Sequence, residues 1–234
     1  MKVSVYIDGF NLYYRIRNRR AADGSTLKWL DLGALCRTLL GKHDVTQIRY
    51  FTAHVRGRPN PDSPIKQQAY LRALGTVPGL TCHFGQFLYK PKSAKLITPL
   101  ADGTEFVMVH KTEEKGSDVN LASHLLLDGF RGSYEMAAVI TNDSDLVEPI
   151  RIVRDELKLH VMVLDPKGIE PDFRPSRSLS GAATSYRSIR ESAVAAAQFP
   201  ETVQTAHGLV SRPAVWGPPT PPVVPAVPPM APPG

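Results

Sequence analysis

Carboxylates follow apolar segments at three places in the chain, and their type and position predict a site for a cation. The four side chains are Asp8, Asp118, Asp143 and Asp145. Carboxylates gathered in one crevice repel each other by about 4 kcal/mol per pair at 4 Å, so a cluster of them needs protons or a cation. Carboxylate oxygens suit hard divalent ions such as Mg²⁺ or Mn²⁺. We therefore expect these side chains to converge around a metal ion.

Each of these residues also has a purely structural explanation. Asp8 precedes Gly9, and Asp-Gly is a strong turn signal. Asp118 falls in the first turn of a predicted helix, where the helix dipole favours a carboxylate. Asp145 and Glu148 resemble a capping box, and Asn11 either caps the following helix or contacts a metal-bound water or a phosphate. Taken one at a time, the motifs leave both explanations open.

The elements that would position these residues alternate along the chain. Apolar runs such as VSVYI and MAAVIT are separated by segments with helical periodicity, which predicts βαβ units and a mostly parallel sheet. Both runs are almost entirely apolar, as expected when helices cover both faces of the sheet. In open α/β sheets, ligands bind at the carboxyl ends of the strands. The aspartates that follow these runs are therefore expected at the binding edge.

A protruding hairpin is expected over residues 88–110, with a turn at 101–103. Its lysines Lys90, Lys92 and Lys95 fit two descriptions. They straddle a phosphate backbone, or they keep an exposed loop soluble.

The folded part of the chain is basic. The net charge is +6, and after residue 190 only Glu191, Glu201 and Arg212 are charged, so residues 1–190 carry +7. This favours an anionic partner such as nucleic acid. Tyr13 and Tyr14 are candidates for base stacking or, alternatively, partly core residues. The arginines expected to attract a strand, or otherwise to form a solvated face, are Arg15, Arg17, Arg19, Arg20, Arg56 and Arg58.

Two segments are expected: a domain over residues 1–190 and an Ala-rich, then Pro-rich linker or disordered tail over residues 191–234. Residues 218–233 contain nine prolines, a composition that favours extended polyproline II over a packed core. This tail is either inert or a ligand for a proline-recognising protein. Self-association into a homo-oligomer is a further option that the sequence leaves open.

The composition also indicates where the protein works. The longest apolar stretches are shorter than the roughly 18 residues that a membrane-spanning helix needs, so no membrane partner is expected. The first residues are expected to form a strand and not a signal peptide. Two cysteines, Cys36 and Cys82, are too few for a disulfide scaffold and are expected to be buried thiols. A cytoplasmic location is therefore expected.

Three segments together resemble a known family. YIDGFNLY, EKGSDVNLA and TNDSDLVEPI are similar, in order and spacing, to the signature segments of the NYN domain family, in the LabA/DUF88 branch of the PIN-like nucleases. The resemblance covers residues 1 to about 190 and implies a three-layer, PIN-like α/β sandwich with a metal-dependent ribonuclease site. The partner that it implies is RNA, single-stranded or not. One position departs from the usual pattern, because Asn142 stands where the family more often has glycine.

The resemblance also implies roles for individual residues. Those implied to be catalytic are Asp8, Asn11, Asp118, Asp143 and Asp145, of which Asp8, Asp118 and Asp143 would hold Mg²⁺ or Mn²⁺. The expected substrate contacts are Lys115, Asn142, Ser144, Arg15 and Arg17.

Two other classes of function remain open at this point. One is a nucleic-acid-binding or scaffold module without turnover, which has no need of a bound ion. The other is a small-molecule enzyme of the oxidoreductase type that uses the same crevice. The absence of a G-x-G-x-x-G segment after the first strand disfavours this second alternative.

Overall fold

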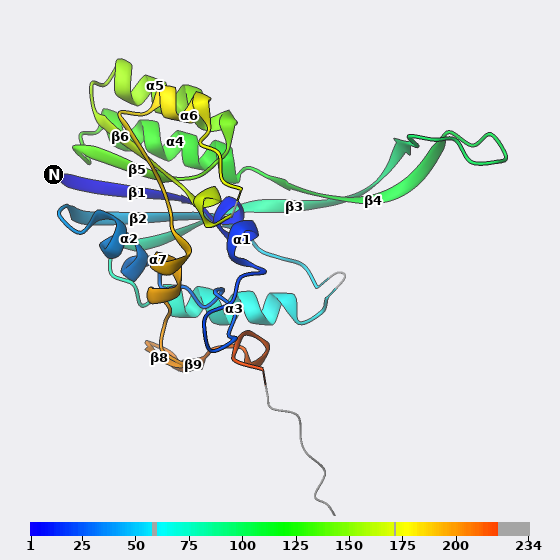
Figure 1. Cartoon of the computed structure of the whole chain (residues 1–234), viewed down its shortest axis with the longest axis horizontal. Coiled ribbons are helices and arrows are strands. Elements are labelled where there is room, and N and C mark those ends of the chain that lie inside the picture. The colour runs from blue at the N-terminus through cyan, green and yellow to red at the C-terminus, as the bar shows by residue number, and fades with distance from the viewer. Residues whose placement is uncertain (58–59, 171, 220–234) are drawn as a thin grey trace, which may run out of the picture.

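The computed structural model describes residues 1–57, 60–170 and 172–219 (Figure 1). The expectations for Arg58 and for residues 220–234 of the Pro-rich tail lie outside the described residues. Within the described part, no helix combines the length and the apolar character needed to cross a bilayer.

A seven-stranded sheet forms the centre of the domain, in the order β4-β3-β2-β1-β5-β6-β7. Neighbouring strands run parallel except for β3 and β4, which form an antiparallel hairpin. The prediction of a mostly parallel sheet is confirmed. The strands of this sheet are β1 (Lys2–Asp8), β2 (Asp44–Ala53), β3 (Leu80–Lys95), β4 (Phe106–Lys115), β5 (Met136–Ile140), β6 (His160–Asp165) and β7 (Ser185–Ser188).

Helices cover both faces of the sheet, so the predicted three-layer architecture is also confirmed (Figure 1). Strand β1 shows why both faces must be covered: Val5 and Ile7 join one apolar cluster and Tyr6 joins the other. One face carries α1 (Gly9–Ile16), α2 (Leu32–Leu40), α3 (Ser63–Leu74) and α7 (Glu191–Ala196), and the other carries α4 (Ser117–Phe130), α5 (Val147–Asp155) and α6 (Arg177–Ala182).

The strand order reverses direction at β1. The chain moves from β1 outward through β2 and β3, and returns to place β5 on the other side of β1. At such a switch point the connections leave β1 and β5 toward opposite faces, which opens a crevice at the carboxyl ends of the two strands. Asp8 and Asp143 follow the apolar parts of these two strands.

The β3–β4 hairpin extends away from the body of the domain as a two-stranded ribbon (Figure 1). Strand β2 pairs with β3 only as far as Gly85, and beyond it β3 is paired with β4 alone. The predicted hairpin is therefore confirmed. Gly103, with a φ of +85°, lies in its turn.

Residues 191–217, which composition assigned to the linker, are folded onto the domain instead. They form α7, a small hairpin of β8 (Thr202–Thr205) and β9 (Gly208–Ser211), and a 3₁₀ turn at Ala214–Trp216. The buried Trp29 ring packs against Phe199 and Trp216, with centroids 5.7 and 6.3 Å away. Aromatic burial of this kind outweighs a composition rich in alanine, because a few large side chains supply most of the apolar area.

Candidate metal centre

Asp8 is fixed at the junction between β1 and α1. Its carboxylate caps the helix, because Oδ1 accepts a hydrogen bond from the Asn11 amide at 2.9 Å. Its Oδ2 accepts one from the Thr141 hydroxyl at 3.1 Å. The next residue must be glycine, since a Cβ at Gly9 would lie 2.5 Å from the carbonyl oxygen of Phe51. Asp8 is consequently both buried and rigidly oriented.

Asp118 lies in the first turn of α4, directly after the β3–β4 hairpin. The chain turns into this helix at Gly116, whose φ is +99°. Glu114 holds the turn, because its carboxylate accepts hydrogen bonds from the Ser117 amide at 3.2 Å and the Ser117 hydroxyl at 2.7 Å. A Cβ on Gly85 of β3 would lie 2.7 Å from the carbonyl oxygen of Lys115, the last residue of β4. Glycine at this position therefore allows the end of β4 to approach β3 closely.

Asp143 follows β5 and caps a short 3₁₀ turn over Ser144–Leu146. Its Oδ1 accepts a hydrogen bond from the Asp145 amide at 3.0 Å. Its own amide donates to the Thr141 hydroxyl oxygen at 3.0 Å. Thr141 is fully buried, so this anchor holds Asp143 against the sheet.

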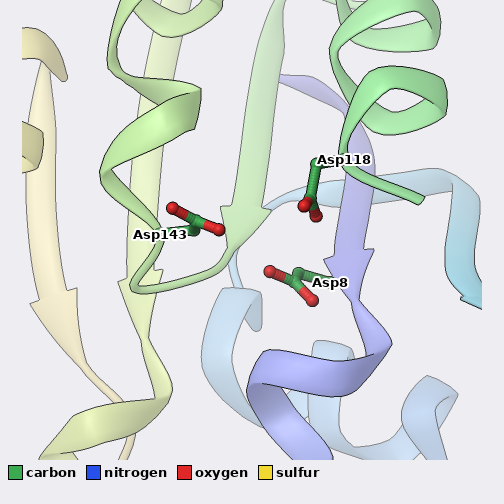
Figure 2. Close-up of side chains that lie close together, drawn as sticks. All are labelled: Asp8, Asp118 and Asp143. Carbon is green, nitrogen blue, oxygen red and sulfur yellow. The ribbon is translucent and has the colours of Figure 1, made fainter. Parts of the chain in front are cut away.

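The three carboxylates converge on one point (Figure 2). Asp8, Asp118 and Asp143 each offer an oxygen, and these oxygens all lie within 4.8 Å of one another. Burial raises the pKa of Asp8 to about 6, the hydrogen bond from Asn11 opposes that rise, and the charge of Asp118 adds to it. Burial also raises the pKa of Asp118, with the charges of Asp143 and Glu114 acting in the same direction. The three carboxylates repel one another, and a bound cation would relieve this repulsion. An oxygen donor set of this kind fits Mg²⁺ or Mn²⁺.

Asp145 and Asn11 lie beside this cluster and play different parts in it. Asp145 is exposed at the start of the 3₁₀ turn, and its charge contributes to the raised pKa of Asp118. Asn11 uses its side-chain oxygen to accept a hydrogen bond from the Asn142 amide at 3.2 Å. It therefore ties α1 to the loop that carries Asp143.

Sequence reasoning missed Asp165, the last residue of β6. This carboxylate is fully buried and accepts hydrogen bonds from the Asn142 side chain at 2.8 Å, from the Lys167 amide at 2.7 Å and from the Tyr186 hydroxyl. It holds the side chain of the asparagine that replaces the usual glycine. The signal was present in the sequence, because LHVMVLD ends in an aspartate after an apolar run, as VSVYID does.

Three of the five expected substrate contacts have partners within the protein. Arg15 forms an ion pair with Glu170 at 2.6 Å, and the Arg17 guanidinium lies 4.9 Å from the centre of the Tyr14 ring. The Nζ atom of Lys115 lies 3.5 Å from Oε2 of Glu113. The other two expected contacts are in the loop after β5, where Ser144 is exposed and Asn142 is partly buried.

The mostly parallel sheet, its two helix layers and the acidic cluster at the switch point are typical of the PIN-like nuclease fold. The chain belongs to the NYN domain family, whose model matches residues 2–190. It is 25% identical over 228 residues to 6-hydroxy-3-succinoylpyridine 3-monooxygenase HspA of Pseudomonas putida (strain DSM 28022 / S16), covering 87% of this chain and 72% of that protein.

A solved structure supports the fold. The protein of unknown function VPA0982 from Vibrio parahaemolyticus RIMD 2210633 superposes with a TM-score of 0.51 at 17% sequence identity. The match covers 81% of this chain and 93% of the Vibrio protein. At this level of identity the likeness concerns the fold alone.

Proposed function

We propose that this protein is a metal-dependent ribonuclease that hydrolyses phosphodiester bonds in RNA. The observation that carries the proposal is the convergence of Asp8, Asp118 and Asp143, whose oxygens lie within 4.8 Å of one another. Membership of the NYN domain family supports the reaction class.

The three aspartates would hold Mg²⁺ or Mn²⁺. Such an ion polarises a phosphoryl oxygen and stabilises the charge that develops during hydrolysis. The protein's contribution is positional: Asp8 is buried and held by two hydrogen bonds, and Asp143 by two more. Because these side chains are already oriented, little reorganisation is needed when the ion and the phosphate bind.

Asp145 is proposed to accept a proton from the attacking water. It is exposed, it follows Asp143 by two residues, and its charge acts on Asp118. Asn11 orients the loop of Asp143 through Asn142. The exposed Ser144 and Lys115, together with Asn142, are proposed to contact the phosphate. Arg15 on α1 and Arg17 directly after it are proposed to contact the strand further along.

Cleavage of labelled RNA by Asp8→Asn and Asp143→Asn tests the proposal directly. Purified protein is incubated with mixed single- and double-stranded RNA and DNA, with Mn²⁺, Mg²⁺ or EDTA. Asp44→Asn is the matched control, because Asp44 is exposed at the first position of β2. The acidic cluster lies near the other end of that strand, where Asp8 pairs with Phe51. We expect the wild type and Asp44→Asn to cleave single-stranded RNA only with metal, and the two cluster variants to lose this activity. Wild-type rates in both cluster variants would refute the proposal.

A second candidate function is oxidation of a small aromatic molecule. The observation that favours it is the similarity to a protein named a 6-hydroxy-3-succinoylpyridine 3-monooxygenase, together with an aromatic-lined cavity of about 600 Å³ beside α1. Incubation with 6-hydroxy-3-succinoylpyridine, NADH and air tests it. Substrate-dependent loss of NADH with an oxygenated product supports this candidate, and its absence in protein that cleaves RNA excludes it.

A cytoplasmic location is part of the proposal. Its support is that Cys36 and Cys82 are both free thiols, a state that a reducing compartment preserves.

A further inference from the structure

A cavity of about 600 Å³ lies between α1 and α3, at the foot of the β3–β4 ribbon. None of the three clustered aspartates lines it, but it adjoins them, because its wall begins at Gly9 and Phe10, directly after Asp8. Its volume is within the range of roughly 300–1,000 Å³ typical of ligand sites. The cavity therefore offers a second binding space within one or two residues of the acidic cluster.

Aromatic rings form much of the wall. Phe10 and Phe87 meet edge to face, with ring centroids 5.5 Å apart, on the side of the cavity next to the acidic cluster. Tyr14 is exposed on α1, and Tyr89 lies at the start of the ribbon. Rings that are partly exposed around an open cavity offer faces for stacking a planar ligand.

The cavity is also positively charged, and among the residues that the structure describes no acidic side chain lines it. Lys28, Arg56 and Lys66 line it, and Lys28 is only partly exposed, with its ammonium 5.4 Å from the centre of the Trp216 ring. Burial lowers the pKa of Lys28, and the neighbouring charges of Lys66 and Arg20 lower it further. Lys66 has an exposed partner, Asp62, at 3.5 Å. Crowded cations of this kind favour an anionic ligand.

The C-terminal segment completes the cavity from outside the family match. Val215 and Trp216 line it, although the NYN match ends at residue 190. The segment is held in place by the carbonyl of Trp216, which accepts a hydrogen bond from the Thr26 amide at 2.9 Å. This wall is thus a feature that the family domain alone does not supply.

We propose that the cavity binds the base and phosphate of a nucleotide next to the cleaved bond in single-stranded RNA, an inference that rests on the proposed function. The base stacks on the aromatic wall and the phosphate contacts Lys28 and Arg56. Phe10 follows Asp8 by only two residues, so a strand whose scissile phosphate lies at the acidic cluster has its neighbouring nucleotide within reach of the cavity.

Photocrosslinking tests this without relying on cleavage. Full-length Asp143→Asn protein is mixed with ten-nucleotide RNAs that carry 5-iodouridine at each position in turn, irradiated, and analysed by peptide mass spectrometry. We expect one or two adjacent positions to crosslink to Phe10, Tyr14, Phe87, Tyr89 or Trp216. Crosslinks confined to other residues would overturn the proposal.

Binding measurements with matched variants give an independent readout. Tyr14→Ala should weaken binding of the same RNA by about five-fold or more, since one base stack is worth about that much. Lys28→Gln should weaken it by a similar factor, because it removes a phosphate contact. Lys42→Gln is the control for Lys28→Gln, because Lys42 is exposed in the turn before β2 and does not line the cavity. Equal affinities for Lys28→Gln, Tyr14→Ala and Lys42→Gln would contradict the proposal.

The two proposals fail separately. Crosslinks in the cavity without metal-dependent cleavage by the wild type would support the nucleotide site and refute the nuclease. Cleavage with crosslinks elsewhere would do the reverse.

Adenosine monophosphate and a small aromatic acid are titrated in parallel. Weak binding of the nucleotide supports the proposed site, whereas binding of the aromatic acid with no affinity for RNA overturns the proposal.

Discussion

The hydroxyl of Thr141 donates a hydrogen bond to Oδ2 of Asp8 at 3.1 Å. The same hydroxyl oxygen accepts the amide of Asp143 at 3.0 Å, so one buried side chain fixes two members of the acidic cluster relative to each other. This link connects the ends of two strands that lie 133 residues apart in the sequence.

Replacing Thr141 with valine keeps the volume and removes both hydrogen bonds. Because Thr141 orients two proposed metal ligands, we expect Thr141→Val to weaken Mn²⁺ binding by about 10- to 100-fold. Thr141→Ser keeps the hydroxyl and should bind metal as the wild type does. Titration calorimetry measures both, and equal affinity in Thr141→Val and the wild type would contradict the assigned role.

The raised pKa of Asp8 predicts a pH-dependent stability. Folding raises this pKa from 3.8 to about 6, so the folded chain holds the proton more tightly and loses stability as the pH rises through that interval. The full effect on the free energy of unfolding is about 3 kcal/mol. Metal-free Asp8→Asn should therefore be more stable than the wild type at neutral pH, with the difference disappearing near pH 4.

Urea unfolding in EDTA at both pH values measures this difference. Asp44→Asn serves as control, because Asp44 is exposed and distant from the cluster along β2. Adding Mn²⁺ should stabilise the wild type and not Asp8→Asn, since a ligand that binds only the folded state raises its stability. A wild type that is more stable than Asp8→Asn in EDTA at neutral pH would contradict the predicted cost of the buried Asp8 charge.

Asp165 is expected to act as a positioning residue through Asn142. In Asp165→Asn, an NH₂ group replaces one carboxylate oxygen. At least one of the three donors that now face Asp165 therefore loses its acceptor, which should destabilise the fold by about 1–3 kcal/mol. Tyr186→Phe removes one of the three donors and keeps the carboxylate. We expect RNA cleavage, measured well below the unfolding temperature, to fall further in Asp165→Asn than in Tyr186→Phe, and the reverse order would contradict the role.

Gly9 is expected to tolerate no side chain. A Cβ there would lie 2.5 Å from the Phe51 carbonyl oxygen and 2.8 Å from the Tyr50 ring. Gly9→Ala should cost about 1–3 kcal/mol of stability and displace α1. Gly181→Ala is the matched control, because a Cβ at Gly181 in α6 meets nothing within 4 Å, and it should leave stability unchanged or raise it by up to about 1 kcal/mol. Thermal unfolding of the two variants measures the contrast.

Much of the fold could be predicted because its signals are local. Apolar runs alternate with amphipathic segments, and aspartates that follow two of those runs meet at one sheet edge. The predicted convergence of Asp8, Asp118 and Asp143 is realised by the strand order, which places β5 beside β1.

What the sequence did not reveal depends on contacts between distant residues. The ion pair between Arg15 and Glu170 could not be predicted, because the two residues lie 155 positions apart and nothing near either one signals the other. Residues 191–217 look like a linker by average composition, whereas the burial of Phe199 and Trp216 against Trp29 decides their structure. Asp165 was overlooked because it lies outside the three signature segments, although it follows the apolar run LHVMVL.

Calorimetric titration of Mn²⁺ into the metal-free protein tests the central claim most directly. If the three carboxylates form one metal site, the wild type and Asp44→Asn bind Mn²⁺ with the same affinity, and Asp8→Asn and Asp143→Asn bind it at least about 100-fold more weakly. Mn²⁺ binding of wild-type strength in either cluster variant would contradict it.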